Sequence, residues 1–316
     1  MSTVVFVHGV GKQYLSEDSL TRDVVPELLG GIRLAGGPVP APEDVAVAFY
    51  GDLFRPRGTR GGGEFPYEAA DVETEDEYRL LMEWWAEAAR TDPAVPAPDA
   101  PGSRGAAGWA ASRALRLASV RSALDALTGA AFLRGMLDAM LIGSLKQLTA
   151  YFSDPAVRSE ARARVAARIT PETKVVVGHS LGSVVAYEAL CDRAHHTGWD
   201  LPMFVTIGSP LGMRALVLDR LDPAPDGNRR AVWPKPVRAW TNIADSTDIV
   251  ALVRELKPSY GDGVTDALVH NGSHMHDATR YLTAAETGRA VAAGLRADGG
   301  ADPTTDGPGS VEDLHR

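Results

Sequence analysis

Short, uninterrupted apolar runs recur along the chain, and amphipathic stretches lie between them. Continuous apolar runs are typical of parallel strands whose two faces are both covered by helices. We therefore predict strands at Val4–Val7, Val45–Tyr50, Val175–Val177 and Phe204–Ile207, with a more mixed fifth at Val237–Ile243. Helical patterns between them include Leu20–Leu29, Ser183–Arg193 and Ala284–Leu295. This alternation predicts an α/β fold with a mostly parallel central sheet flanked by helices.

A segment from about residue 52 to about residue 150 interrupts this alternation. It begins with a Gly/Arg-rich loop, Arg57 to Gly63, and continues into an acidic helix that carries Tyr78, Leu81, Met82, Trp84 and Trp85. A Pro/Ala/Gly-rich stretch follows, from Thr91 to Gly108, and we expect it to be mobile. The last part is a long helical region from Leu117 to Leu148 with apolar residues at spacings of three and four, which predicts one apolar face.

Two arrangements of this segment remain open. The simpler one packs the apolar face of its C-terminal half on the sheet, as amphipathic helices usually pack. The other makes the segment a cap or lid over the active site, part of which could contact lipid. For Glu64 to Gly108 the sequence favours a cap. We predict one domain over residues 1–296 with this insertion, and a disordered tail from 297 to 316.

The composition of the chain limits the classes of binding partner and the cellular compartment that we expect. The chain has 316 residues, 45% of them hydrophobic, and a net charge of −9, which argues against a nucleic-acid surface. Cys191 is the only cysteine, so neither a disulfide framework nor a cysteine metal cluster is expected. The N-terminus has no basic region before its apolar run, and no uncharged stretch is long enough to span a membrane. These features predict a cytoplasmic protein, and the excess of arginine over lysine (27 to 5) suggests a bacterial gene of high GC content.

The candidate chemistry begins at Gly178-His179-Ser180-Leu181-Gly182. This G-x-S-x-G run lies between a predicted buried strand and a predicted helix, which is the context of the nucleophile elbow of an α/β-hydrolase. The tight turn forces strained backbone angles on the serine, and Gly178 and Gly182 prevent a clash between strand and helix. The motif occurs once in the chain. We therefore predict Ser180 as a nucleophile.

A serine nucleophile needs a base and a carboxylate that orients the base, in the chain order serine, acid, histidine. The acid is expected just after a strand, where Asp245 and Asp248 follow the predicted strand Val237–Ile243. From the residues alone the two aspartates are equally good candidates. Either one, or Ser246, could instead cap a helix beginning near Ile249.

Eight histidines are present, and three of them follow the acid in a polar loop: His270, His274 and His276. Each suits a catalytic base, although each could also be an ordinary loop residue. The pair His274-x-His276 could bind a metal ion, but the third ligand and the spacing of known zinc sites are missing. We therefore expect neither a metal nor an organic cofactor.

The oxyanion formed on attack needs two hydrogen-bond donors. One is the backbone N–H of Leu181, at the start of the helix after the nucleophile. The second is expected in the glycine-rich turn His8-Gly9-Val10-Gly11 after the first strand, from Gly9 or Val10. A phosphate-loop interpretation of this turn is weak because the rest of that motif is absent.

Taken together, these elements resemble the lipase-like branch of the α/β-hydrolase superfamily, and most closely bacterial relatives of lipases and of GPI inositol-deacylase-like proteins. The resemblance is carried by residues 6–11, the elbow 178–182, Gly208-Ser209-Pro210, Trp240 and Asn242 with the two aspartates, and His276 ahead of Tyr281-Leu282. It implies Asp248 as the acid, His276 as the base and Val10 as the second oxyanion donor. Lipase-like members often have a proline where this chain has Ala251.

The expected function is hydrolysis of a carboxylic ester through an acyl-enzyme, with a small, apolar ester or acyl substrate. The alternative with the same triad is a thioesterase or an acyltransferase of a biosynthetic pathway, in which a capped pocket excludes water. A third hypothesis is a non-catalytic binding module on a hydrolase scaffold, because fold does not imply function.

Overall fold

The computed structural model of the chain describes residues 2–55, 67–98, 113–128, 134–194 and 198–297. In this part of the chain, six strands form one sheet with the order β2-β1-β3-β4-β5-β6. Every neighbouring pair is parallel. The strands are β1 Val4–Val7, β2 Val45–Ala48, β3 Val175–His179, β4 Leu201–Ile207, β5 Val237–Asp245 and β6 Val264–Val269.

The five predicted strands are confirmed, with small shifts at their ends. The second strand stops at Ala48 because the backbone N–H of Tyr50 leaves the sheet and donates to His8 Nε2 (3.1 Å). The sixth strand, β6, was not predicted. It lies at the sheet edge, and its residues are mostly half-buried or exposed, so its sequence lacks the continuous apolar run of the other strands.

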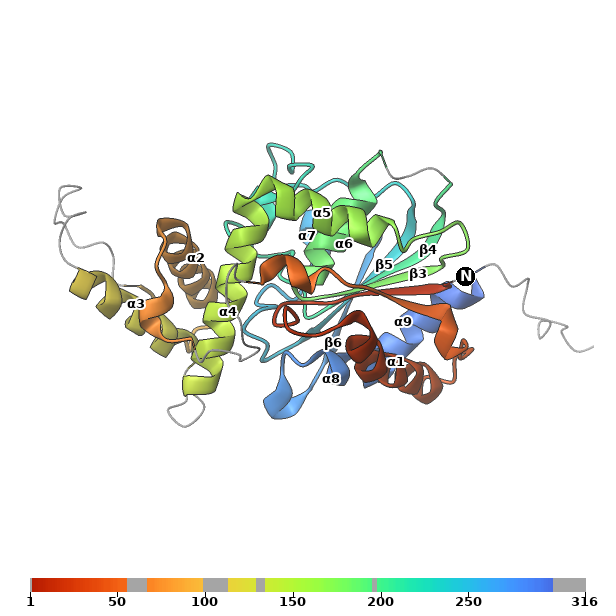
Figure 1. Cartoon of the computed structure of the whole chain (residues 1–316), viewed down its shortest axis with the longest axis horizontal. Coiled ribbons are helices and arrows are strands. Elements are labelled where there is room, and N and C mark those ends of the chain that lie inside the picture. Colours follow the sequence, from red (N-terminus) through yellow and green to blue (C-terminus); the bar gives the residue numbers. More distant parts are fainter. Residues whose placement is uncertain (1, 56–66, 99–112, 129–133, 195–197, 298–316) are drawn as a thin grey trace, which may run out of the picture.

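Helices cover both faces of the sheet (Figure 1). On one face lie α1 (Glu17–Leu34), α8 (Ala278–Thr283) and α9 (Ala285–Arg296), and on the other α5 (Pro155–Ala166) and α6 (Leu181–Cys191). Strand β1 shows the consequence, because Val4 and Phe6 join the apolar core under α1 whereas Val5 and Val7 join the core under α6. Both faces are therefore buried, which explains the uninterrupted apolar runs.

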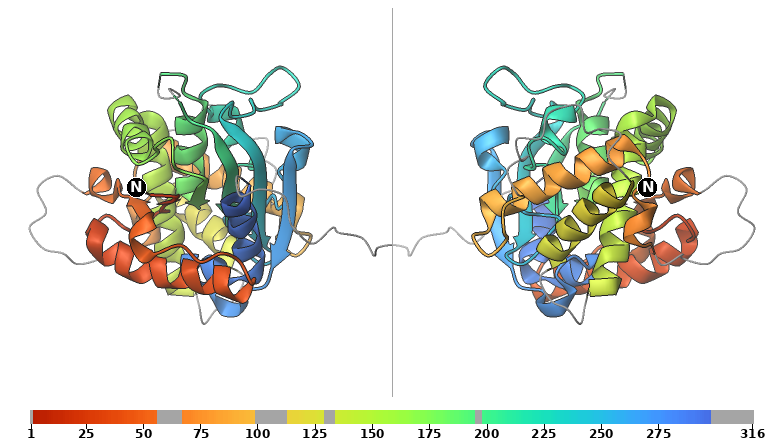
Figure 2. Two further views of the ribbon diagram at one scale, coloured as in Figure 1. Left: turned by 90° about the vertical axis from the view of Figure 1, so that its right-hand side faces the viewer. Right: turned by 90° about the vertical axis from the view of Figure 1, so that its left-hand side faces the viewer.

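Three further helices lie beyond the carboxyl ends of the strands rather than on either face (Figure 1). They are α2 (Glu75–Thr91), α3 (Arg113–Thr128) and α4 (Arg134–Ser153), and they cross in front of that end of the sheet (Figure 2). Helix α4 packs mainly against α2, α3 and α5. The apolar side of α4 is thus buried among helices and strand-end loops, not laid along the sheet as the simpler arrangement expected. We call α2, α3 and α4 the helical roof.

The roof is tied to the rest of the protein by buried polar contacts. Trp84 of α2 donates from Nε1 to the carbonyl of Ile249 (2.9 Å). Tyr151 of α4 donates to Glu188 of α6 (2.6 Å), a carboxylate that is fully buried and also paired with Arg158 of α5. Removing one partner of such a buried pair typically costs about 3–5 kcal/mol. These contacts hold the roof in one position over the strand ends.

Several expectations fall outside the described residues. They are the Gly/Arg-rich loop 57–63, most of the Pro/Ala/Gly-rich stretch, and the tail from 298 onward. Within the described ranges, no helix combines the length and the apolar character needed to cross a lipid bilayer.

Candidate functional site

Ser180 lies in the tight turn between β3 and α6, as the motif predicts. Its backbone has φ 52° and ψ −129°, a strained combination for a residue with a side chain. The flanking glycines explain how the turn closes. A Cβ on Gly178 would lie 2.7 Å from Ser183 Cα, and one on Gly182 would lie 2.3 Å from the carbonyl oxygen of His8. Glycine is therefore required at both positions for helix and strands to approach this closely.

Buried polar contacts hold the turn in place. The N–H of Ser180 donates to the carbonyl of Ile207 in β4 (3.1 Å). Ser183 donates from its hydroxyl to the carbonyl of Ser180 (2.6 Å), and its Oγ also lies 2.7 Å from Ser209 Oγ. The strained turn is thus fixed by neighbouring strands, which leaves the Ser180 hydroxyl in one position.

His276 bridges Ser180 and Asp248. Its Nε2 lies 2.9 Å from Ser180 Oγ, and its Nδ1 lies 2.8 Å from Asp248 Oδ2. Because a carboxylate oxygen only accepts, Nδ1 carries the proton, and Nε2 is left to accept from the serine hydroxyl. The Asp248 side chain is fully buried and that of His276 is 7% exposed. The structure therefore brings together the three residues expected to form a triad.

Tyr281 and Gly208 fix the position of Asp248. The Tyr281 hydroxyl accepts from the N–H of Asp245 (2.7 Å), so its own proton goes to Asp248 Oδ2 (2.8 Å). Burial, together with the adjacent Asp248, raises the pKa of Tyr281 and keeps it protonated. Gly208 has φ +54°, and a Cβ there would lie 3.1 Å from Asp248 Oδ2. A side chain at position 208 would thus crowd the atoms of Asp248 and His276 that contact each other.

Asp245, the competing acid candidate, has other partners. It accepts from the N–H and the hydroxyl of Thr247 (2.7 and 2.6 Å) and from the N–H of Asn271. Although burial opposes ionisation, these donors hold the pKa of Asp245 below its usual range. Asp245 therefore ties β5 to the loop that carries the histidines.

The helix that Asp245, Ser246 or Asp248 was expected to cap near Ile249 does not form. Asp248 Oδ1 does accept from the N–H groups of Val250 (2.8 Å) and Ala251 (3.4 Å) in the manner of a cap. The chain nevertheless continues as a loop, and the next helix, α7, is the short segment Lys257–Tyr260. Asp248 Oδ1 thus shapes a turn while Oδ2 faces His276.

The other two histidines of this loop lie apart from the serine. His270 and His274 are both exposed, and His274 ends the short 3₁₀ helix Gly272–His274. Both ring nitrogens of His276 already contact protein groups, so a metal pair with His274 is not formed. Among the described residues, no group of three or more His, Cys, Asp or Glu side chains is arranged to hold a metal ion.

Two buried histidines next to the site are neutral. Burial lowers the pKa of His8 to about 4, and its Nε2 accepts from the N–H of Tyr50, so its Nδ1–H donates to the carbonyl of Gly9 (2.7 Å). Burial also holds the pKa of His179 well below its usual value, with the nearby His276 adding to the effect. The Nε2–H of His179 donates to the carbonyl of His276 (3.1 Å). His8 thus holds the glycine turn, and His179 holds the backbone of His276.

The two expected oxyanion donors lie beside Ser180. Leu181 begins α6, so its N–H has no acceptor within the helix. Gly9 packs directly on Ser180, because a Cβ on Gly9 would lie 2.7 Å from Ser180 Cβ. Val10 follows Gly9 and lines the same cavity as Ser180 and Leu181. The turn 8–11 and the helix start therefore meet at the serine, and they do so between β1 and β3, where the strand order changes direction.

A small cavity lies over Ser180, between the strand ends and the roof. Its volume is about 20 Å³, enough for roughly one water molecule. Apart from two serines its lining is apolar: Val10, Trp84, Ser144, Leu148, Ser180, Leu181, Pro210, Met213, Leu216 and Val250. Trp84 comes from α2, and Ser144 and Leu148 come from α4, so the roof forms one wall of the cavity.

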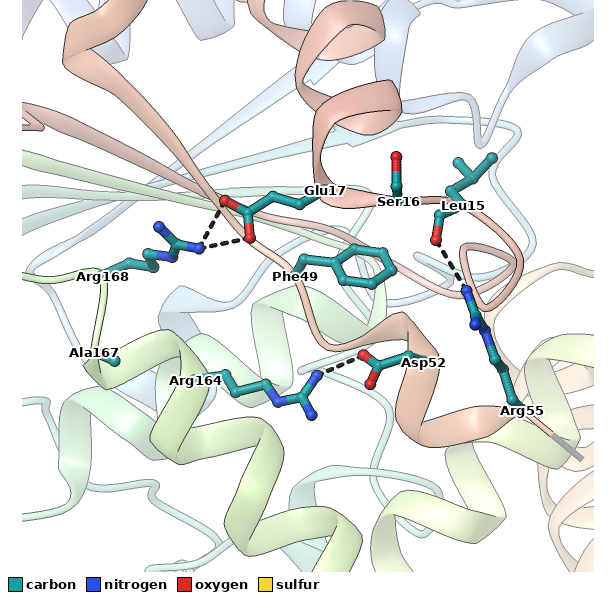
Figure 3. A pocket seen from close by; sticks show the side chains of 9 residues that line it. All are labelled: Leu15, Ser16, Glu17, Phe49, Asp52, Arg55, Arg164, Ala167 and Arg168. Carbon is teal, nitrogen blue, oxygen red and sulfur yellow. Dashed lines mark hydrogen bonds and ion pairs between the residues drawn. The ribbon is translucent and has the colours of Figure 1, made fainter. Parts of the chain in front are cut away.

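A much larger hollow, of about 610 Å³, lies on another part of the surface (Figure 3). Its charged side chains face one another in pairs, Arg168 with Glu17 and Arg164 with Asp52, while Arg55 donates to the carbonyl of Leu15 (Figure 3). Two of its three arginines are thus paired with carboxylates, and no histidine lies in its lining to activate a nucleophile. We therefore locate the candidate site at Ser180 and not at the larger opening.

Sequence reasoning did not find the supporting residues of the site. The role of Tyr281 depends on the direction of its hydroxyl, and the place of Ser144 in the cavity wall depends on where α4 lies, so no local pattern marks them. Gly208 carried a signal, because a Gly-Ser-Pro run after a strand indicates a turn that needs positive φ.

In comparisons with known proteins, no family model, curated protein or solved structure matches the chain.

Proposed function

We propose that this protein is a serine hydrolase that cleaves carboxylic esters through an acyl-enzyme, on an α/β-hydrolase fold with a helical cap. The observation that carries the proposal is the position of His276, 2.9 Å from Ser180 Oγ and 2.8 Å from Asp248 Oδ2. A base in hydrogen-bond contact with both a nucleophile and an orienting carboxylate is the arrangement that nucleophilic catalysis by serine requires. The resemblance to lipase-like hydrolases is consistent with this proposal.

In this proposal, Ser180 Oγ attacks the ester carbonyl while His276 Nε2 takes its proton. The buried Asp248 carboxylate stabilises the imidazolium that results, and the N–H groups of Val10 and Leu181 bind the oxyanion. His276 then returns the proton to the leaving alcohol. Water, activated by the same His276, releases the acid from Ser180. Each step uses a group whose position is fixed by strand ends or by the start of α6.

The proposal is tested by labelling Ser180 with a fluorophosphonate and by measuring cleavage of short nitrophenyl esters. We expect labelling of the wild type, and a loss of about 10⁴- to 10⁶-fold in kcat for Ser180→Ala. The matched control is Thr173→Ala, which removes a buried hydroxyl near the start of β3, where it contacts Ser2 and Thr170 and not the site. Ester cleavage by Ser180→Ala at the wild-type rate would rule the proposal out, and so would unlabelled wild type without esterase activity.

One observation favours a second function, transfer of the acyl group to an acceptor other than water. The cavity over Ser180 is small and mostly apolar, and a site that admits little water protects an acyl-enzyme from hydrolysis. A thioesterase or acyltransferase would use the same triad. Product analysis with ester and thioester donors, in the presence of alcohol and amine acceptors, separates these activities from simple hydrolysis.

A further inference from the structure

Ser144 is the feature of the cavity that the proposed chemistry does not use. It lies in α4 and lines the cavity together with Ser180 and Leu181. The residue is 5% exposed, and its Oγ is buried without a hydrogen-bond partner in the described structure. A buried hydroxyl with no partner is unfavourable, and native proteins avoid it unless a ligand or water completes the contact.

The missing contact sets Ser144 apart from hydroxyl groups of the neighbouring helix α3. Such side chains commonly donate to the carbonyl one turn earlier. Ser119 does so to Leu115 (3.1 Å) and Thr128 to Leu124 (2.8 Å), both in α3. Ser144 makes no such bond, although it lies in a regular helix. Its hydroxyl therefore keeps its hydrogen-bonding capacity in the wall of the cavity.

The other groups around the cavity cannot satisfy this hydroxyl. Trp84 is the other roof residue with a polar atom in the lining, and its Nε1 already donates to the carbonyl of Ile249. The hydroxyl of Ser180 is engaged by His276. Neither of these side chains pairs with Ser144, so a water or a ligand that enters the cavity can supply the partner. The apolar residues of the lining favour a ligand that is otherwise apolar.

We propose that Ser144 is a specificity-determining residue whose hydroxyl binds a polar group on the substrate. This inference rests on the proposed esterase function and names its substrate class. The substrate is an ester whose acyl or alcohol chain is apolar except for one hydroxyl or carbonyl group, placed to reach Ser144. Binding such a chain requires side chains of the roof to move, because the cavity holds little more than one water molecule.

The test compares matched pairs of esters that differ only in the polar group. One series holds the alcohol constant and places a hydroxyl or a keto group at successive carbons of the acyl chain. The other series holds an acetyl group constant and varies the alcohol between simple alkanols and the corresponding diols. The measured quantity is the ratio of kcat/KM for the substituted ester to kcat/KM for its unsubstituted partner.

In the wild type, at least one position of the polar group is expected to raise this ratio about tenfold, the effect of one well-placed neutral hydrogen bond. Ser144→Ala is expected to lower the ratio to about one, whatever its activity on the unsubstituted ester. A general defect of packing or folding would lower both rates together, so the ratio reports the contact itself.

Thr149→Val provides the matched control. Thr149 is also in α4 and its Oγ1 is also buried without a partner, but Thr149 does not line the cavity. We expect Thr149→Val to keep the wild-type ratio. The inference is overturned if no ester pair shows a preference in the wild type, or if the preference survives in Ser144→Ala. Wild type that neither cleaves any ester nor reacts with a fluorophosphonate contradicts the proposed function instead, and this inference with it.

Discussion

The strand ends and the helical roof contribute to the cavity over Ser180 in different ways. On the strand side, Ser180, Asp248 and His276 are fixed by the tight turn after β3, by Tyr281 and by the neighbouring buried histidines. On the roof side, α2 and α4 contribute apolar side chains and one hydroxyl, and few polar contacts reach the strand-end loops. In our proposal, the strand ends supply the bond chemistry, and the roof contributes to the choice of the molecule that reaches Ser180.

The contacts at the strand ends predict a large difference in kcat between Asp248→Asn and Asp245→Asn, although the two residues are only three positions apart. Asp248→Asn should lower kcat by about 10³- to 10⁴-fold, because an amide in place of the carboxylate no longer holds the proton on His276 Nδ1 or stabilises the imidazolium. Asp245→Asn is the matched control, since it removes an equally buried carboxylate from the same loop. It should cost about 1–3 kcal/mol of unfolding free energy, because an amide satisfies fewer of the donors around it.

Steady-state kinetics and denaturant unfolding of both variants check this prediction. The kcat of Asp245→Asn should stay within about tenfold of the wild type, since this residue holds the backbone of Asn271 and does not contact His276. An equal loss of kcat in the two variants would contradict the different roles of Asp248, which orients His276, and Asp245, which supports the loop.

The choice between these aspartates also shows how far the sequence could predict the site. The turn at Ser180 is encoded locally, because glycines two residues before and after the serine are needed where β3 and α6 meet, so the motif and its context were sufficient. Asp245 and Asp248 follow the same strand, and no local pattern separates them. They are separated by where their oxygens point, which depends on Tyr281 and on a loop brought in from about thirty residues further along the chain.

The roof was less predictable for a related reason. The amphipathic pattern of α4 requires a buried face, but it looks the same whether that face packs on a sheet or among other helices over its end. The edge strand β6 was missed because half-exposed residues such as Thr265 and Asp266 break the apolar run. Ser144 in a helix resembles any small residue until its neighbours are known.

Acid sensitivity provides the next test of how the strand ends are held. The pKa of His8 falls from an ordinary 6.5 to about 4 in the folded protein, because the ring is buried and its Nε2 accepts from Tyr50. A depressed histidine pKa means that unfolding takes up a proton at low pH. This contribution to stability is therefore complete above about pH 6.5 and is lost as the pH falls towards 4, by about 3 kcal/mol.

His8→Asn removes the titrating group and should flatten this part of the stability curve. The measurement is the unfolding free energy from denaturant titrations between pH 7 and pH 4, compared as slopes, since the substitution also lowers the absolute value by removing a buried hydrogen bond. His179 contributes in the same direction in both proteins, because burial lowers its pKa too. Parallel curves for wild type and His8→Asn would contradict a neutral His8.

The smallest expected effect tests a hydrogen bond between the roof and the proposed oxyanion turn. Gln147 of α4 accepts from the N–H of Gly11 (3.3 Å), and its Nε2 donates to Gln13 (3.0 Å). Gly11 follows Val10, so this contact positions an amide that we propose binds the oxyanion. Gln147→Leu keeps the size of the side chain but leaves both partners unsatisfied. We expect a loss of about tenfold in kcat with little change in KM, because only the transition state carries the oxyanion.

Lys146→Met is the matched control for this effect. Lys146 neighbours Gln147 in α4, but its ion pair with Glu77 (3.1 Å) lies within the roof and does not reach the strand ends. Loss of this pair leaves the buried Glu77 carboxylate with its two backbone donors, so it should cost about 1–3 kcal/mol of unfolding free energy and leave kcat unchanged. If both variants lower kcat equally, the roof acts on catalysis only through its general packing. If Gln147→Leu raises KM and leaves kcat intact, the contact serves substrate binding. The roof would then act on substrate binding alone, and the strand ends would carry the whole of the proposed bond chemistry.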